Sequence, residues 1–293
     1  MTEQPHDPAA PAEDAPPAAV TPAADAPPAA PAAAPPRPAG DRRVLRAVLR
    51  WTAAVAVFAA VGASTAYGIT RAERTDLPGL ATEPDGRWAY PALVGPPLPS
   101  GSPGPFAEEN RAGTHHADLR ALLLPAPEGA KEDPALRGAD GWLPVKGFLA
   151  EFARQEDRTE VGQRLTDHGL RHIAARGWTT RDGTHTRIYL LQFDTAAVVD
   201  AVGGGYLAPY DMPRFPARGA GTLEADERFP QEAQVDDVLR VPYAEPKPYG
   251  AEQVRQAYVA AGDVLAMVIQ SREGAAEPVP FQQTVTLQSQ LLR

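Results

Sequence analysis

The sequence contains no cysteine among its 293 residues. Disulfide bonds, cysteine nucleophiles, thiolate metal sites and lipid attachment through cysteine are therefore excluded, and packing alone must stabilise a folded domain. Serine is scarce after residue 112, where only Ser271 and Ser289 remain, and neither lies in a Gly-x-Ser-x-Gly motif.

The net charge is −9, and no basic run follows residue 71. Nucleic-acid binding therefore lacks electrostatic support, and we expect no nucleic-acid partner.

Residues 51–69 form a long run without a charged side chain. A helix of this length spans roughly 28 Å, which is close to the ~30 Å hydrocarbon core of a bilayer. Arginines are concentrated just before this run, whereas only Arg71 and Arg74 follow closely, interleaved with acidic residues. We therefore predict a basic juxtamembrane segment over residues 41–50 and one transmembrane helix over residues 51–70.

The distribution of arginines also predicts an orientation in the cell membrane. By the positive-inside rule, the N-terminus lies in the cytoplasm and the rest of the chain is extracytoplasmic. A cleavable signal peptide is the alternative interpretation, with Ser64 and Ala66 as the small residues before a cleavage site. Both interpretations export the same domain.

The remainder of the chain divides by composition. Residues 1–40 are dominated by proline and alanine and predict a disordered cytoplasmic tail. Residues 71–112 are rich in proline and predict a semi-rigid stalk. Within this stalk, residues 87–94 are apolar enough to dock on the domain as an edge strand. We predict that residues 113–293 form the extracytoplasmic domain.

The basic residues are used unevenly, since the 28 Lys and Arg residues include only three lysines. This usage, the Pro/Ala-rich tail, the arginine cluster and the single apolar run together resemble uncharacterised single-pass, membrane-anchored proteins of high-GC actinobacteria. The resemblance covers composition and layout and carries no catalytic motif. It implies a signal-anchor and an extracytoplasmic domain, and it implies no activity.

Periodicity and turn residues predict an α+β fold for the domain. The Asp182-Gly183 and Gly262-Asp263 pairs each stand between extended segments and predict two β-hairpins. The expected elements are a strand over residues 119–124, a helix from residue 148, a helix over 159–176 ending at Gly177, hairpin strands over 178–180 and 186–193, a short helix to residue 202, hairpin strands over 254–260 and 264–270, and a helix over 281–292. We expect two hairpin–helix units that pair into one antiparallel sheet with the helices on one face.

Two histidines are the candidate metal ligands. His168 and His172 are four residues apart in the predicted helix, so both would face the same side and could bind a zinc ion. A metalloprotease motif would need glutamate after the first histidine, but Gly169 occupies that position, which removes the general base. Histidines on the polar face of a helix are the alternative interpretation, and we predict no cofactor.

A second group of candidates combines histidine with acids. His115 and His116 precede Asp118 and could form a base and its orienting carboxylate, with Ser271 as a possible nucleophile, but we predict no catalytic residue. Two acidic clusters could hold a cation, but their spacing fits no calcium loop. We therefore expect solvated surface acids at both clusters, which comprise Glu151, Glu156 and Asp157, and Asp236 and Asp237.

The candidate ligand or partner site lies in a long loop, residues 203–221. Three successive glycines there lack the Gly-x-Gly-x-x-Gly form and follow a helix, so they predict no phosphate cradle. Tyr206, Tyr210 and Phe215 follow the glycines, and aromatic residues in long loops often contact ligands.

Taken together, these observations favour a membrane-anchored extracytoplasmic domain that binds or scaffolds. Its expected partners are the lipid bilayer and an extracytoplasmic ligand or protein. Two alternatives stay open: an exported metal-dependent or histidine-based hydrolase, and an extracytoplasmic sensor.

Overall fold

The computed structural model describes residues 41–71 and 85–293, so the predicted tail over residues 1–40 and part of the predicted stalk lie outside the described residues. The chain divides into two compact units, Met1–Pro78 and Gly79–Arg293, and each is described by itself.

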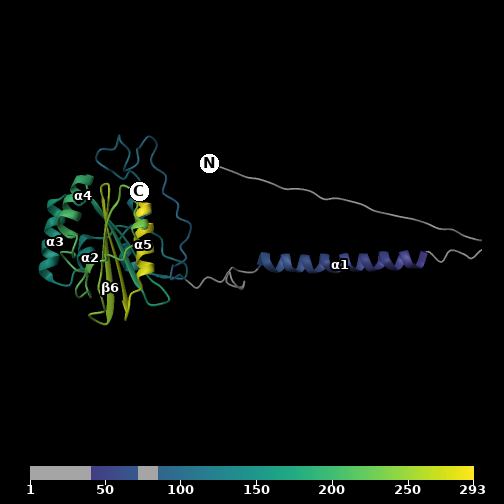
Figure 1. Cartoon of the computed structure of the whole chain (residues 1–293). Coiled ribbons are helices and arrows are strands. Elements are labelled where there is room, and N and C mark those ends of the chain that lie inside the picture. Colours follow the sequence, from purple (N-terminus) through teal and green to yellow (C-terminus); the bar gives the residue numbers. More distant parts are fainter. Residues whose placement is uncertain (1–40, 72–84) are drawn as a thin grey trace, which may run out of the picture. The chain divides into compact units, whose positions relative to one another are not determined.

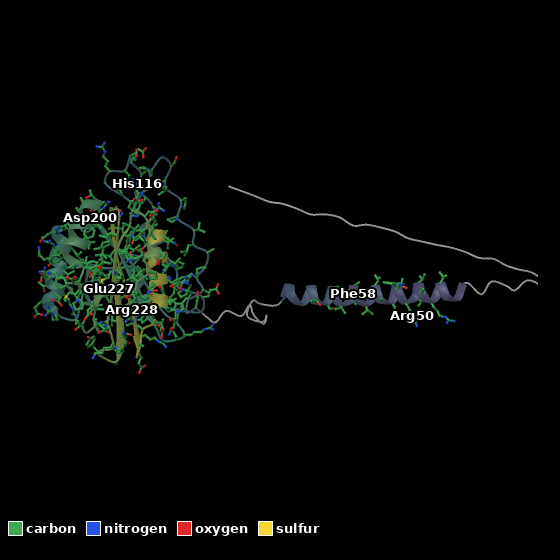
Figure 2. The ribbon with its side chains drawn as sticks, in the orientation of Figure 1. Arg50, Phe58, His116, Asp200, Glu227 and Arg228 are labelled. Atoms are coloured by element: carbon green, nitrogen blue, oxygen red, sulfur yellow. The ribbon has the colours of Figure 1, made fainter. Side chains whose placement is uncertain are left out.

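The described part of the first unit is one helix, α1 (Asp41–Arg71). Its stretch Val44–Thr65 has a mean hydropathy of 1.8, and it is the one helix in the described residues that is long and apolar enough to cross a membrane. Phe58 projects from this helix with 84% of its surface exposed (Figure 2). Apolar side chains exposed in this way match the environment of a lipid bilayer better than that of water.

The second unit is built on a seven-stranded antiparallel sheet with the order β1-β2-β3-β7-β6-β5-β4. Its strands are β1 (Lys131–Glu132), β2 (His172–Thr179), β3 (His185–Gln192), β4 (Glu224–Ala225), β5 (Leu239–Ala244), β6 (Glu252–Ala261) and β7 (Val264–Glu273). Both predicted hairpins are confirmed, because β2 pairs with β3 around Asp182-Gly183 and β6 pairs with β7 around Gly262-Asp263. The two hairpins join along β3 and β7, where Leu190 lies opposite Ala266.

Helices cover both faces of this sheet (Figure 1). The helices are α2 (Val145–Leu149), α3 (Gln155–Asp167), α4 (Ala196–Val202) and α5 (Pro278–Leu291), with short turns η2 (Leu119–Leu122), η3 (Pro134–Arg137), η4 (Gly203–Leu207) and η5 (Gln231–Ala233). Side chains of α2, α3 and α4 form one hydrophobic cluster with one face of the sheet, and α5 joins a second cluster on the other face.

The prediction that helices pack on one face is therefore wrong, and β7 shows why. Leu265 and Met267 of this strand belong to the cluster under α2–α4, whereas the alternating Val264 and Ala266 belong to the cluster under α5. A strand that is apolar at successive positions presents both faces to a core.

The helix predicted over residues 159–176 ends earlier, at Asp167. Gly169 has a left-handed φ of +68°, its N–H donates to Thr166 O, and the N–H of Leu170 donates to Leu165 O. This pair of hydrogen bonds is a Schellman motif, which glycine favours because it lacks a Cβ. The following residues belong to β2, and Gly177 lies within that strand.

The strand predicted over residues 119–124 is a short 3₁₀ helix instead, Leu119–Leu122. The carboxylate of Asp118 accepts the N–H of Arg120 at 3.0 Å and caps this turn. A side chain that satisfies an otherwise free N–H favours a helical turn over an extended strand.

Residues 87–94 dock on α5 through hydrogen bonds to its side chains and do not form the predicted edge strand. The N–H of Trp88 donates to Gln283 Oε1 at 2.8 Å, and Gln283 Nε2 donates to Trp88 O at 2.9 Å. The hydroxyl of Tyr90 lies 2.9 Å from Thr284 Oγ1. The compact unit therefore includes residues that precede the expected boundary at residue 113.

Candidate functional site

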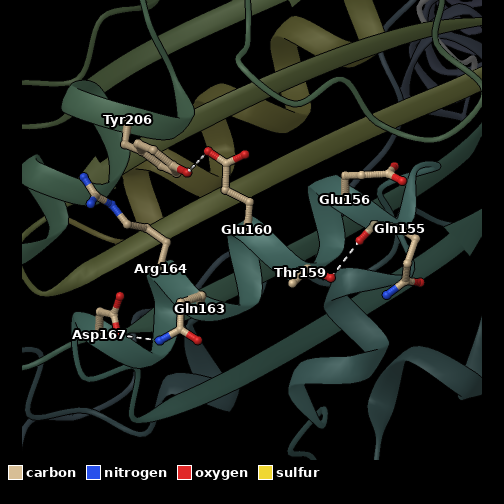
Figure 3. A pocket seen from close by; sticks show the side chains of 8 residues that line it. All are labelled: Gln155, Glu156, Thr159, Glu160, Gln163, Arg164, Asp167 and Tyr206. Carbon is tan, nitrogen blue, oxygen red and sulfur yellow. Dashed lines mark hydrogen bonds between the residues drawn. The ribbon is translucent and has the colours of Figure 1, made fainter.

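A polar groove of about 700 Å³ lies along the exposed face of α3 (Figure 3). Side chains three or four residues apart share one face of a helix, so the sequence of α3 places a row of polar groups there. The groove is lined by Gln155, Glu156, Thr159, Glu160, Gln163, Arg164, Asp167 and Tyr206. We name this feature the α3 groove.

Tyr206 reaches the groove from η4 (Gly203–Leu207), a π-helical turn that continues α4. The N–H of Ala208 donates to Gly203 O at 2.8 Å and closes this wide turn. A Cβ at Gly203 would lie 2.9 Å from Leu265 Cδ1, so a larger residue there would require the Leu265 side chain to shift. Single π-turns are rare and frequently occur at functional sites.

Contacts on both the ring and the hydroxyl hold Tyr206. The guanidinium carbons of Arg164 and Arg214 lie over its ring at 4.2 Å and 4.5 Å from the ring centroid. The hydroxyl donates to Glu160 Oε1 at 2.5 Å, and Arg214 Nη2 donates to the same oxygen at 3.0 Å. Cation–π contacts and charge-assisted hydrogen bonds together fix the ring at one wall of the groove.

These contacts also shift the pKa values of Glu160 and Tyr206. The hydrogen bond from Tyr206 and then the contact with Arg214 lower the pKa of Glu160. Burial, followed by the hydrogen bond to Glu160, raises the pKa of Tyr206. Glu160 therefore remains ionised and Tyr206 remains protonated at neutral pH. The α3 groove offers a polar ligand amides, carboxylates, a guanidinium and a hydroxyl beside one ordered aromatic ring.

The structure brings together two of the three predicted contact residues. The rings of Tyr206 and Phe215 lie 5.7 Å apart, but Phe215 is buried and packs against Phe152. Tyr210 is 77% exposed and is not among the residues that line the groove. Tyr206 is thus the one predicted contact residue that reaches the α3 groove.

The predicted pairing of His168 with His172 on one helical face is wrong, because the helix ends between them. His168 caps α3 with its Nδ1 3.0 Å from Arg164 O. His172 begins β2 and its ring lies 4.6 Å from that of Trp142. Residues 41–71 and 85–293 contain no group of three histidines or acids that could hold a metal ion.

His115 has a structural role that sequence spacing did not reveal. Its Nδ1 lies 2.6 Å from Asp263 Oδ1, and its Nε2 lies 2.8 Å from Leu292 O, in a site where the imidazole is almost fully buried. Both ring nitrogens are therefore occupied. Asp118, the expected partner, instead accepts hydrogen bonds from Arg120. Asp263 stands in the second hairpin turn, far away in the sequence.

Two acids that we expected in solvent, Glu151 and Asp157, are buried, with 3% and 4% of their surface exposed. Arg187 Nε donates to Glu151 Oε2 at 3.0 Å, and the hydroxyl of Tyr189 donates to Glu151 Oε1 at 2.8 Å. Asp157 is bound by Arg154. A buried carboxylate needs such partners, and the partners of Glu151 come from β3.

His185 lies beside the same ion pair. Its Nδ1 is 3.0 Å from Arg187 Nη1, and because a guanidinium only donates, the imidazole accepts this hydrogen bond and is neutral. Burial, and then the charge of Arg187, lower the pKa of His185, against opposing contributions from Asp133, Glu151 and Glu252.

We expect this histidine to make the domain less stable in mild acid. Unfolding restores the ordinary pKa of His185 near 6.5, so the unfolded chain binds the proton first, and the free energy of unfolding falls as the pH drops below about 6.5. Urea unfolding from pH 7.5 to 5.5 should therefore show a smaller pH dependence in His185→Gln than in the wild type. His116→Gln, at an exposed histidine (Figure 2), is the control for removing a histidine as such. Equal pH dependence in His185→Gln and the wild type would contradict this expectation.

Comparison of the sequence with models of known protein families gives no match, and comparison with curated proteins gives no relative. The chemistry of the α3 groove therefore follows from its own residues.

Proposed function

We propose that the chain is a single-pass membrane protein whose C-terminal domain lies outside the cytoplasm and binds a polar ligand in the α3 groove. The apolar length of α1 and the concentration of arginines before residue 51 support the anchor and its orientation. The bilayer is one partner in this proposal, and the extracytoplasmic ligand is the other.

The proposed binding role rests on one observation, the fixed position of the Tyr206 side chain. Arg164, Arg214 and Glu160 of the protein itself hold the ring and its hydroxyl. A side chain that is already ordered loses little conformational entropy when a ligand arrives. A half-buried tyrosine that lines the groove and is held by three such partners is therefore a prepared contact surface.

The lining favours a neutral, polyhydroxylated ligand such as a saccharide. Gln155 and Gln163 offer amide donors and acceptors, and the carboxylates of Glu156 and Asp167 are exposed acceptors for hydroxyl groups. These carboxylates and Glu160 disfavour a strongly anionic ligand by like-charge repulsion. The open form of the groove suits a chain of sugar units.

The test is calorimetric titration of the full chain in lipid nanodiscs with soluble oligosaccharide fragments of a bacterial cell wall. We expect saturable binding by the wild type and at least tenfold weaker binding by Tyr206→Leu. Tyr210→Leu is the matched control, since this tyrosine lies outside the groove, and it should bind like the wild type. Wild-type affinity in Tyr206→Leu, or no heat with any saccharide, would contradict the proposal.

A further inference from the structure

A second cavity, of about 380 Å³, lies at the C-terminal end of α5. One wall comes from the domain, through residues that include Leu122 and Leu291, and the other comes from the preceding segment, through Leu93, Pro96 and Leu98. Helix α5 covers the face of the sheet that is opposite to α3, so this cavity is separate from the α3 groove (Figure 1). We name it the α5 cavity.

Residues 95–105 form a strap over this cavity. Before the strap, Trp88 and Tyr90 attach the chain to α5 through their hydrogen bonds. After the strap, the carbonyl of Gly113 accepts the N–H of Asp263 at 2.8 Å. Within the described residues, the hydrogen bonds of the strap itself stay local, such as Ser102 N–H to Pro99 O at 3.0 Å. A segment fixed at both ends and free in the middle can open and close over its cavity without unfolding the domain.

The charged groups at the α5 cavity are already compensated. His115 is bound through both ring nitrogens, to Asp263 and to Leu292 O. Arg293 Nη2 lies 3.6 Å from Asp236 and 3.9 Å from Asp237. A charged ligand would lose hydration without gaining a free counter-ion, which is costly in an apolar site.

The size of the α5 cavity also restricts its occupant. A volume of about 380 Å³ falls in the range of small-molecule sites, which is ~300–1,000 Å³. One turn of a partner helix, about 10 Å wide and 5.4 Å long, would need more than roughly 400 Å³. We propose that the α5 cavity binds a small, uncharged, apolar molecule beneath the strap. This proposal is independent of the role of the α3 groove.

Two glycines allow a matched test. Gly104 lines the cavity, and a Cβ added there would meet no atom within 4 Å, so Gly104→Phe adds a phenyl ring at the cavity lining without a close contact at the Cβ. A Cβ at Gly250 likewise meets no atom within 4 Å, and this residue lies outside the cavity. Gly250→Phe therefore controls for adding a phenyl ring to the surface.

The probe is the neutral photolabel 3-trifluoromethyl-3-phenyldiazirine, applied to the full chain in lipid nanodiscs, with labelled peptides located by mass spectrometry. Labelling of α1, which faces the lipid in the proposed topology, is the internal standard in every sample. We expect labelling of the peptides that contain Leu98 and Leu122 in the wild type, at least a fivefold loss in Gly104→Phe, and no loss in Gly250→Phe. Labelling at background level in the wild type, or undiminished labelling in Gly104→Phe, would overturn the proposal.

Discussion

Replacing Arg187 with methionine is expected to lower the free energy of unfolding of the C-terminal domain by about 3–5 kcal/mol. The side chains of Arg187 and Glu151 are 7% and 4% exposed, and the substitution leaves the Glu151 carboxylate buried without its counter-ion. The hydroxyl of Tyr189 still donates to it, but one neutral hydrogen bond does not compensate a buried charge. Arg218 compensates this charge only weakly, because its Nη2 lies 4.0 Å from Glu151 Oε1 and its side chain is largely exposed to solvent, which screens the pair.

Urea unfolding of the full chain in a mild detergent, followed by tryptophan fluorescence, measures this loss. The double variant Glu151→Gln/Arg187→Met should be more stable than Arg187→Met alone, since it no longer buries a charge. Arg137→Met breaks the exposed pair with Glu132 and should cost less than about 1 kcal/mol. A cost for Arg187→Met as small as that of Arg137→Met would show that the buried pair contributes little.

Replacing Asp263 with alanine should cost roughly 3–5 kcal/mol, because three donors lose one buried acceptor group. The carboxylate of Asp263 accepts a hydrogen bond from the backbone N–H of His115 at 2.9 Å and one from the ring Nδ1 of His115 at 2.6 Å. It also accepts one from Gln192 Nε2 at 3.1 Å. None of these groups is exposed enough for water to replace the lost oxygen atoms. The turn that follows β6 would then keep its backbone hydrogen bond to Gly113 O but lose its side-chain connection to His115.

The other hairpin turn provides the control. Asp182→Ala removes a carboxylate that accepts hydrogen bonds from Thr180 and Thr184 in a partly exposed turn, and it should cost at most about 1.5 kcal/mol. Unfolding midpoints of the two variants can be compared in the same detergent. If Asp263→Ala were no more destabilising than Asp182→Ala, the buried cluster around His115 would have no special role in stability.

The local signals in the sequence were sufficient where turn chemistry decides the structure. Asp182-Gly183 and Gly262-Asp263 predicted both hairpins, and the side chain of Thr195 caps α4, which matches the predicted short helix to residue 202. In each case the deciding contacts connect residues close in sequence, so side-chain preferences alone identify them.

Periodicity failed where two kinds of element follow each other directly. Val161 and Leu165 belong to α3, whereas Ile173, which continues the same apparent spacing, belongs to β2. The true stop was Gly169, which lies between the histidines, and Gly177 was misread as the stop. A run that is apolar at both helical and alternating positions does not distinguish a helix from a buried strand.

The candidate site was predictable only in part, for the same reason. The glycine run pointed to Tyr206, but Glu160, Arg164 and Arg214 come from other segments and assemble around it only in the folded domain. Likewise, nothing near Glu151 in the sequence indicates that Arg187 will neutralise it. Long-range partners of charged groups follow from the topology of the sheet, which local patterns do not encode.

The strand order has a consequence for how the chain is made. The interior strand β3 pairs on one side with β2, but its other partner, β7, is completed about 80 residues later. At a synthesis rate of roughly 5–20 residues per second, this delay amounts to roughly 4–16 s. During that interval an apolar strand has one unpaired edge, a form of exposure that promotes aggregation. Protection of the newborn chain over these seconds must come from the ribosome and chaperones, because the partner that closes this edge has not yet been made.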